Sequence, residues 1–266
     1  MADKVLPGPT EHRPCPGSGV NIHTSKILDA CRDKDCIDDL RVYPTVSSQA
    51  IIDSAFSVRP ESATLLYADV NVDAISFNRG HYTVDVTYFY LITGQSFPGG
   101  VPIRGLAVFD KRVILYGSEG SVKTFSSLSD LRSSIALQQA APVAVVEAVD
   151  PIALNLRIAD GCGGCMPGDP EMRSVPAEIV EAIGESLNLS AGGKRLYVTL
   201  GQFSMIRLER DYQLSLSGAE SFLPSRECVG SSDDDPCTLF SRVRFPVEEF
   251  YPPDTLPCGE CYRDLV

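Results

Sequence analysis

The sequence predicts a mainly β protein: an antiparallel β-sandwich or barrel-like sheet with one short helix and extended cysteine-bearing arms at both ends. Two observations support this prediction. In HYTVDVTYFYLIT (81–93), apolar and polar side chains alternate, which is the pattern of a half-buried antiparallel strand. Further short apolar segments separated by Gly and Pro follow along the chain, as is typical of sandwiches and barrels.

The N-terminal part of the chain predicts little regular structure before the first strand. Residues 1–24 are rich in Pro, Gly and polar side chains, and they predict an extended arm that carries Cys15. The acidic stretch that follows, within 25–43, predicts a helical turn. We expect the first strand at Leu40–Val46, where the apolar side chains begin.

The central and later parts of the chain predict a series of antiparallel strands. Residues 70–77 should pair with 81–93 across the Gly-containing turn Asn78–Gly80. Along 81–93, every second residue from Tyr82 to Ile92 should share the buried face. Five further strands are predicted at 141–149, 151–158, 194–200, 203–209 and 212–217, with turns at Gly201–Gln202 and Arg210–Asp211.

One segment, 176–187, has a helical pattern. It begins with Pro176, and Ile179, Ile183 and Leu187 follow at helical spacing, with an interruption at Gly184. The predicted organisation is an N-terminal arm (1–24), a β-rich core (25–223) and a Cys- and Pro-rich C-terminal tail (224–266). The Gly- and Pro-rich segment around Cys162 leaves open whether the core is one domain or two sub-domains, 40–158 and 176–223.

The charge balance excludes two classes of partner. The 266 residues contain 35 acids and 23 bases, a net charge of −12, which would repel a nucleic-acid backbone and an anionic membrane surface. No apolar segment approaches the length of a transmembrane helix, and the N-terminus lacks the apolar region of a secretory signal. We therefore expect synthesis in a reducing cytosol, where disulfides are rare.

The sequence contains only incomplete matches to the motifs of known catalytic sites. The sequence PCGEC (257–261) matches half of a zinc deaminase signature, but none of the three histidines has the Glu two residues later that the other half needs. Neither Cys-x-x-Cys pair precedes a helix that would stabilise a catalytic thiolate. GQSFP (94–98) is not a nucleophile elbow, and AGGKR (191–195) is not a P-loop. The sequence predicts no enzyme and no cofactor.

The cysteines are the candidate functional residues. A chain of this length can bury its own core, so nine cysteines are not needed to reach stability. None lies in an alternating apolar segment, and the odd number leaves at least one without a partner in its own chain. All nine are candidates for disulfide cross-links: Cys15, Cys31, Cys36, Cys162, Cys165, Cys228, Cys237, Cys258 and Cys261.

Zinc binding is the alternative interpretation. Two Cys-x-x-Cys pairs can supply the four thiolates of a tetrahedral Zn²⁺ site, although these two pairs lie much further apart in sequence than those of a zinc ribbon. The ligands would be Cys162, Cys165, Cys258 and Cys261, and the protein would then be a cytosolic zinc-stabilised β protein.

Three blocks of sequence resemble a known family. DACRDKDCIDDLRVY (29–43), RECVGSSDDDPCTLF (226–240) and FPVEEFYPP (245–253) are similar to segments of cysteine-rich spore coat and exosporium proteins of endospore-forming clostridia. That family includes an exosporium protein that self-assembles.

The resemblance implies a self-assembling spore-surface protein in an ordered lattice or filament, with partners that are copies of itself and other spore-surface proteins. The implied disulfide role falls on Cys31, Cys36, Cys228 and Cys237, which lie within matching blocks. It also implies synthesis in the mother-cell cytoplasm and oxidation of the thiols once that cell lyses.

Overall fold

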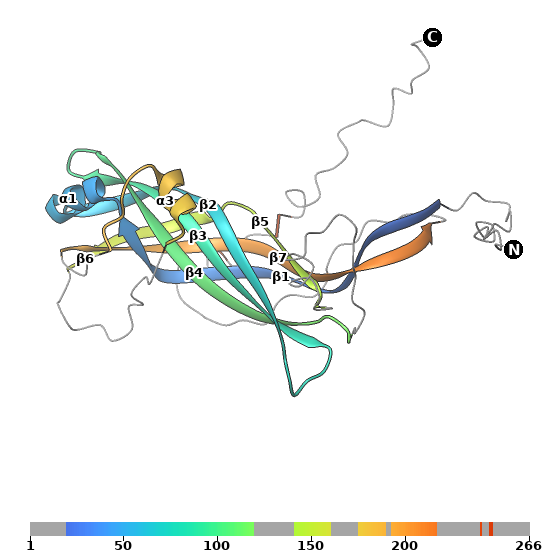
Figure 1. Ribbon diagram of the computed structural model, residues 1–266. Coiled ribbons are helices and arrows are strands. Elements are labelled where there is room, and N and C mark those ends of the chain that lie inside the picture. Colours follow the sequence, from blue (N-terminus) through green and yellow to red (C-terminus); the bar gives the residue numbers. More distant parts are fainter. Residues whose placement is uncertain are drawn as a thin grey trace, which may run out of the picture.

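The computed structural model describes residues 20–119, 141–160, 175–189, 193–216, 240 and 245–246. These residues form one antiparallel sheet that curves into a nearly closed barrel, with two short helices at one end (Figure 1). In chain order the elements are β1 (Val20–Pro44), α1 (Val46–Ser54), β2 (Ser57–Ala74), β3 (His81–Phe97), β4 (Pro102–Tyr116), β5 (Val143–Ala148), β6 (Ile152–Ala159), α3 (Ala177–Ile183) and β7 (Arg195–Leu216).

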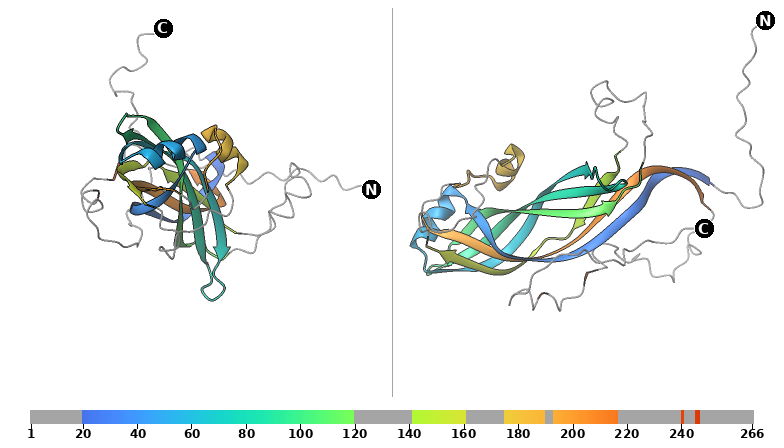
Figure 2. Two further views of the ribbon diagram at one scale, coloured as in Figure 1. Left: turned by 90° about the vertical axis from the view of Figure 1, so that its left-hand side faces the viewer. Right: turned by 90° about the horizontal axis from the view of Figure 1, so that it is seen from below.

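The strand order is β2-β3-β4-β1-β7-β5, and β6 also pairs with β7. The edge strand β2 lies against β6 and β5 at the other side of the sheet, so the sheet curves until its two edges meet (Figure 2). The predicted fold class, a mainly antiparallel β protein with barrel-like sheets, is confirmed.

The alternating pattern of 81–93 places one face of β3 inside the barrel, as predicted. The side chains from Tyr82 to Ile92 at every second position are buried in the main core. The opposite face of β3 carries Phe89, which is buried beneath α3 together with Ile179 and Ile183. The barrel therefore has its main core inside and a smaller apolar cluster outside, under α3.

The predicted hairpin at 70–93 is also confirmed. β2 and β3 pair from Ser57↔Phe97 to Ala74↔Tyr82. The turn between them is longer than the predicted Asn78–Gly80, because the hydrogen bond from the Ile75 amide to the His81 carbonyl closes it.

The start of the sheet was predicted wrongly. β1 begins at Val20, inside the segment predicted as an arm, and it continues through the stretch predicted as a helical turn. Long-range pairing overrides the local signal, because β1 pairs with β7 over nearly its whole length. Val46, predicted as the end of a strand, instead begins α1, which Thr45 caps by accepting a hydrogen bond from the Ser48 amide.

The last three predicted strands are one continuous strand, β7. The predicted turn at Gly201 is wrong because Gly201 pairs with Cys36 on one side and with Ile152 on the other. The predicted turn at Arg210–Asp211 is wrong because these residues pair with Lys26 and Ser25. The remaining predictions for strands 141–149 and 151–158 correspond to β5 and β6.

The predicted helix at 176–187 is present but shorter. α3 ends at Ile183 because Gly184 adopts a left-handed conformation with φ 77°, which favours glycine at a helix C-terminus. The strands of the two possible sub-domains, 40–158 and 176–223, lie in a single sheet. Of the predicted tail, 224–266, only residues 240 and 245–246 are among the described residues.

The close pairing of β4 with β1 at Gly105 generates a stability prediction. A Cβ at Gly105 would lie 2.7 Å from Val42 Cγ1 and 2.8 Å from the Tyr43 carbonyl oxygen. Gly105→Ala should lower the free energy of unfolding by roughly 1–3 kcal/mol, because the backbone of β1 cannot yield easily. Urea unfolding measures this, with Arg104→Ala, an exposed neighbour, as the control. Equal stability of Gly105→Ala and the wild type would contradict this close approach of β1 to Gly105.

Candidate functional site

Two of the nine candidate cysteines lie on β1. Cys31 is 2% exposed and belongs to the core inside the barrel. Cys36 lies five residues after Cys31 on the same strand. Because side chains alternate along a strand, its side chain points to the outer face. The other seven, including all four ligands of the zinc interpretation, lie outside the described residues: Cys15, Cys162, Cys165, Cys228, Cys237, Cys258 and Cys261.

Cys31 and Cys36 are each disulfide-bonded. They cannot bond to each other, because five strand residues span about 16 Å, whereas a disulfide needs Cα atoms within roughly 7 Å. They also point to opposite faces of β1.

Phe240 and Phe245 pack on the outer face of β1 and β7 beside Cys36. Phe240 is 2% exposed, and its ring lies 4.8 Å from the ring of Phe203 and against Gly201. Lys34 Nζ lies 5.0 Å from the centroid of the Phe240 ring. Phe245 packs edge-on against Phe203 at 5.6 Å. At these two phenylalanines the predicted tail is part of the folded body, which no local sequence pattern indicated.

A charged cluster lies inside the barrel. Lys111 of β4 contacts the carboxylates of Asp33 and Asp35 of β1, and all three side chains are largely buried. Burial raises the pKa of Asp35 to about 6, while the positive charge of Lys111 opposes this rise. The negative charge of Asp33, which shares the same ammonium group, adds to the rise in the pKa of Asp35.

Two tyrosines continue this polar interior. Tyr88 and Tyr90 stack at 6.0 Å, and burial raises the pKa of Tyr88 to about 12 and that of Tyr90 further. A hydrogen bond with Ser204 partly opposes the rise at Tyr88. The Tyr90 hydroxyl and Gln202 Oε1 are buried and make no hydrogen bond within the described part of the chain. Buried polar atoms without hydrogen-bond partners lower the stability of the fold, so apolar side chains at these positions would be more stabilising.

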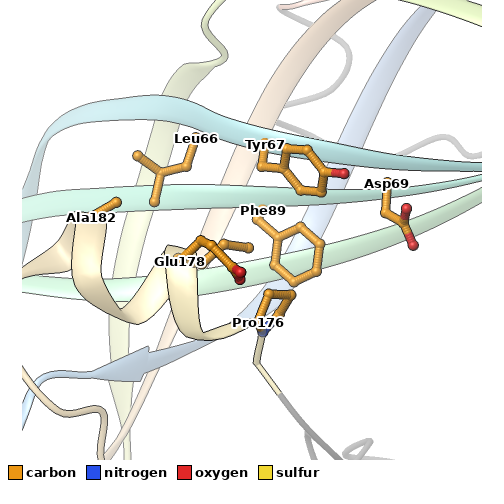
Figure 3. A pocket seen from close by; sticks show the side chains of 8 residues that line it. Leu66, Tyr67, Asp69, Phe89, Pro176, Glu178 and Ala182 are labelled. Carbon is orange, nitrogen blue, oxygen red and sulfur yellow. The ribbon is translucent and has the colours of Figure 1, made fainter.

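A pocket of about 540 Å³ lies outside the barrel, between α3 and the outer face of β2 and β3. Figure 3 shows its aromatic floor, made by Tyr67 and Phe89 with ring centroids 6.2 Å apart. Two carboxylates, Asp69 from β2 and Glu178 from α3, lie at its rim (Figure 3). The lining is completed by Leu66, Pro176, Ile179 and Ala182.

The chemistry of this pocket favours a ligand with an apolar or aromatic body and a positive charge. Aromatic faces attract cations, and the two rim carboxylates add favourable Coulomb energy. Sequence reasoning missed the site because Tyr67 and Glu178 are far apart in sequence, and only the packing of α3 on Phe89 brings them together.

No protein-family model, curated protein or solved structure matches the chain. Within the described ranges, no three His, Cys, Asp or Glu side chains are arranged to hold a metal ion. No helix in the described part is long and apolar enough to cross a membrane.

The Asp35 cluster predicts a pH-dependent stability. Because the folded-state pKa of about 6 exceeds the ordinary value of 3.8, the folded state binds this proton more tightly. The stability from Asp35 is therefore present below about pH 4 and is lost as pH rises through 6. When the pH is raised from 4.5 to 7, the free energy of unfolding of Asp35→Asn should therefore increase relative to that of the wild type by about 2 kcal/mol.

Urea unfolding of both proteins at the two pH values measures this difference. Asp85→Asn is the matched control, because Arg112 lowers the pKa of Asp85 and its contribution is lost only in more acidic solution. An Asp35→Asn effect that is the same at both pH values would contradict the raised pKa.

Proposed function

We propose that the chain is a structural subunit that self-associates into an ordered lattice or filament stabilised by disulfide cross-links, and that it is not an enzyme. The observation that carries the proposal is a two-stranded ribbon that projects from the barrel (Figure 1). It consists of the pairs from Val20↔Leu216 to Lys26↔Arg210 of β1 and β7.

The ribbon leaves the barrel at Arg210. This side chain donates a hydrogen bond from Nε to the Gly117 carbonyl oxygen at 2.8 Å. β5 pairs with β7 only as far as Glu209, so beyond that point neither strand of the ribbon has a second neighbour within the described residues. Among the described residues, both outer edges of the ribbon therefore have backbone donors and acceptors with which a strand of another chain could pair.

An isolated two-stranded ribbon is only marginally stable in water. One face of this ribbon carries Ile22 opposite Leu214, followed by Tyr212, which is about half exposed. A third strand from a neighbouring subunit would complete the hydrogen bonding along one edge of the ribbon, and its side chains would extend that face. Strand addition between copies is thus the association that the ribbon favours.

The cysteine count supports cross-linking between copies. The chain has nine cysteines, an odd number. At least one thiol in each chain therefore has no partner in its own chain. Oxidation of two such thiols on neighbouring copies, with dioxygen or a small disulfide accepting the two electrons and two protons, would lock a contact already formed.

The place of assembly rests on the resemblance to spore coat and exosporium proteins. The block 29–43 lies in β1 and includes Cys31 and Cys36. We therefore propose the spore surface as the location, and further copies of the chain and other spore-surface proteins as its partners.

Electron microscopy in negative stain tests the proposal directly. The purified oxidised protein should form ordered arrays or filaments, and a strong reductant should weaken them, because the disulfides lock contacts that are weak alone. Single particles of uniform size in both conditions would contradict self-assembly. Equimolar zinc that survives dialysis of such particles would then favour the zinc-stabilised alternative.

A ribbon variant tests the route of assembly. Leu214→Lys places a charge opposite Ile22, on the face that also carries Tyr212. It should abolish arrays, because the charge would lie beside the apolar side chains of an added strand. Gln213→Lys adds the same charge on the opposite face and should assemble normally. Light scattering and microscopy measure both, and arrays of Leu214→Lys that match the wild type would exclude strand addition at this face.

A further inference from the structure

We propose that the turn between β2 and β3 of one subunit docks in the α3 pocket of a second copy. The inference deepens the proposed function, because it names a surface through which the copies would associate. The turn, residues 75–80, is called the knob, and the pocket between α3 and the outer face of β2 and β3 is called the socket.

The knob presents an aromatic ring and a positive charge together. Phe77 is 91% exposed, which is unfavourable for a large apolar side chain in water. Arg79, two residues later, is also exposed. The backbone of the knob is fixed by hydrogen bonds from the Asn78 amide to the Ile75 carbonyl and from the His81 amide to the Asn78 carbonyl, both 3.1 Å. The two side chains therefore project from an ordered support.

The socket is complementary to this pair of side chains in shape and charge. Its floor of Tyr67 and Phe89 is suited to a phenyl ring, since offset or edge-on aromatic contacts are favourable. Asp69 and Glu178 at its rim are suited to a guanidinium group. A volume of about 540 Å³ has room for both the Phe77 ring and the end of Arg79.

A subunit cannot fill its own socket. Tyr67 and Phe77 are ten residues apart along one extended ribbon, which separates them by about 30 Å. Figure 1 shows the β2–β3 turn projecting at one end of the molecule and α3 at the other. A knob-to-socket contact joins two different surfaces, so it repeats head to tail and generates a filament or a ring.

Charge exchange between two variants tests this contact. Arg79→Glu places a negative charge on the knob against an acidic socket, and Glu178→Arg places a positive charge in the socket against a basic knob. Each variant alone should weaken association by at least about tenfold. Mixed in equal amounts, the two should associate again, because the acidic knob then meets a basic socket and the remaining knobs and sockets are unchanged.

The measurement is sedimentation velocity of the full chain over a series of concentrations in strong reductant, which removes disulfide cross-links. Phe77→Ala should also weaken association, whereas Phe56→Ala, which removes another ring that is 84% exposed, should not. Arg59→Glu is the matched charge control on exposed β2 sequence. Circular dichroism confirms that each variant is folded.

Three outcomes would overturn the proposal: reduced wild-type protein that is monomeric throughout, single variants that associate like the wild type, or a mixture that stays dissociated. The proposed function fails separately, since it requires ordered arrays of the oxidised protein. Arrays that persist with Phe77→Ala would reject the knob contact and leave assembly through the β1–β7 ribbon.

Discussion

The pairing of β1 with β7 is the constraint on which the rest of the structure depends. The two strands pair from Val20↔Leu216 to Val42↔Leu196, and register shifts interrupt the ladder at only two places. β7 also holds β5 and β6, and β1 holds β4, so the two strands join both parts of the sheet. Because the ladder is longer than the barrel, its far end becomes the projecting ribbon. One pairing thus forms the body and the surface proposed for assembly.

The ladder also determines where charge is buried. Side chains alternate along β1, so the register that points Cys31 into the core points Asp33 and Asp35 inward as well. Two carboxylates in an apolar barrel would be very costly without a counter-charge, and Lys111 of β4 supplies it. The same alternation points Cys36 outward, to the face that Phe240 covers. A shift of one residue would exchange these environments, so the charges help to fix the register.

How much could be predicted from the sequence depends on where the stabilising partner lies. The alternation in 81–93 is local, and it predicted the inner face of β3 correctly. The acidic stretch of β1 is stabilised by Lys111, more than seventy residues away, so local propensity indicated a helical turn instead. Gly201 suggested a turn, but the ring of Phe240 lies against its backbone and a Cβ there would be only 2.6 Å from it. The socket is likewise formed by distant segments, so no motif marks it.

The two proposed contacts differ in kind, and this difference suggests how an ordered assembly would form. Strand addition at the ribbon uses backbone groups, which any extended segment can match, so it gives affinity with little selectivity. The knob and socket use a ring and a charge in fixed positions, so they select one orientation. A contact that selects orientation and a contact that adds affinity reinforce each other when both form on the same pair of copies. Disulfides formed afterwards would then fix an arrangement that the weaker contacts had already selected.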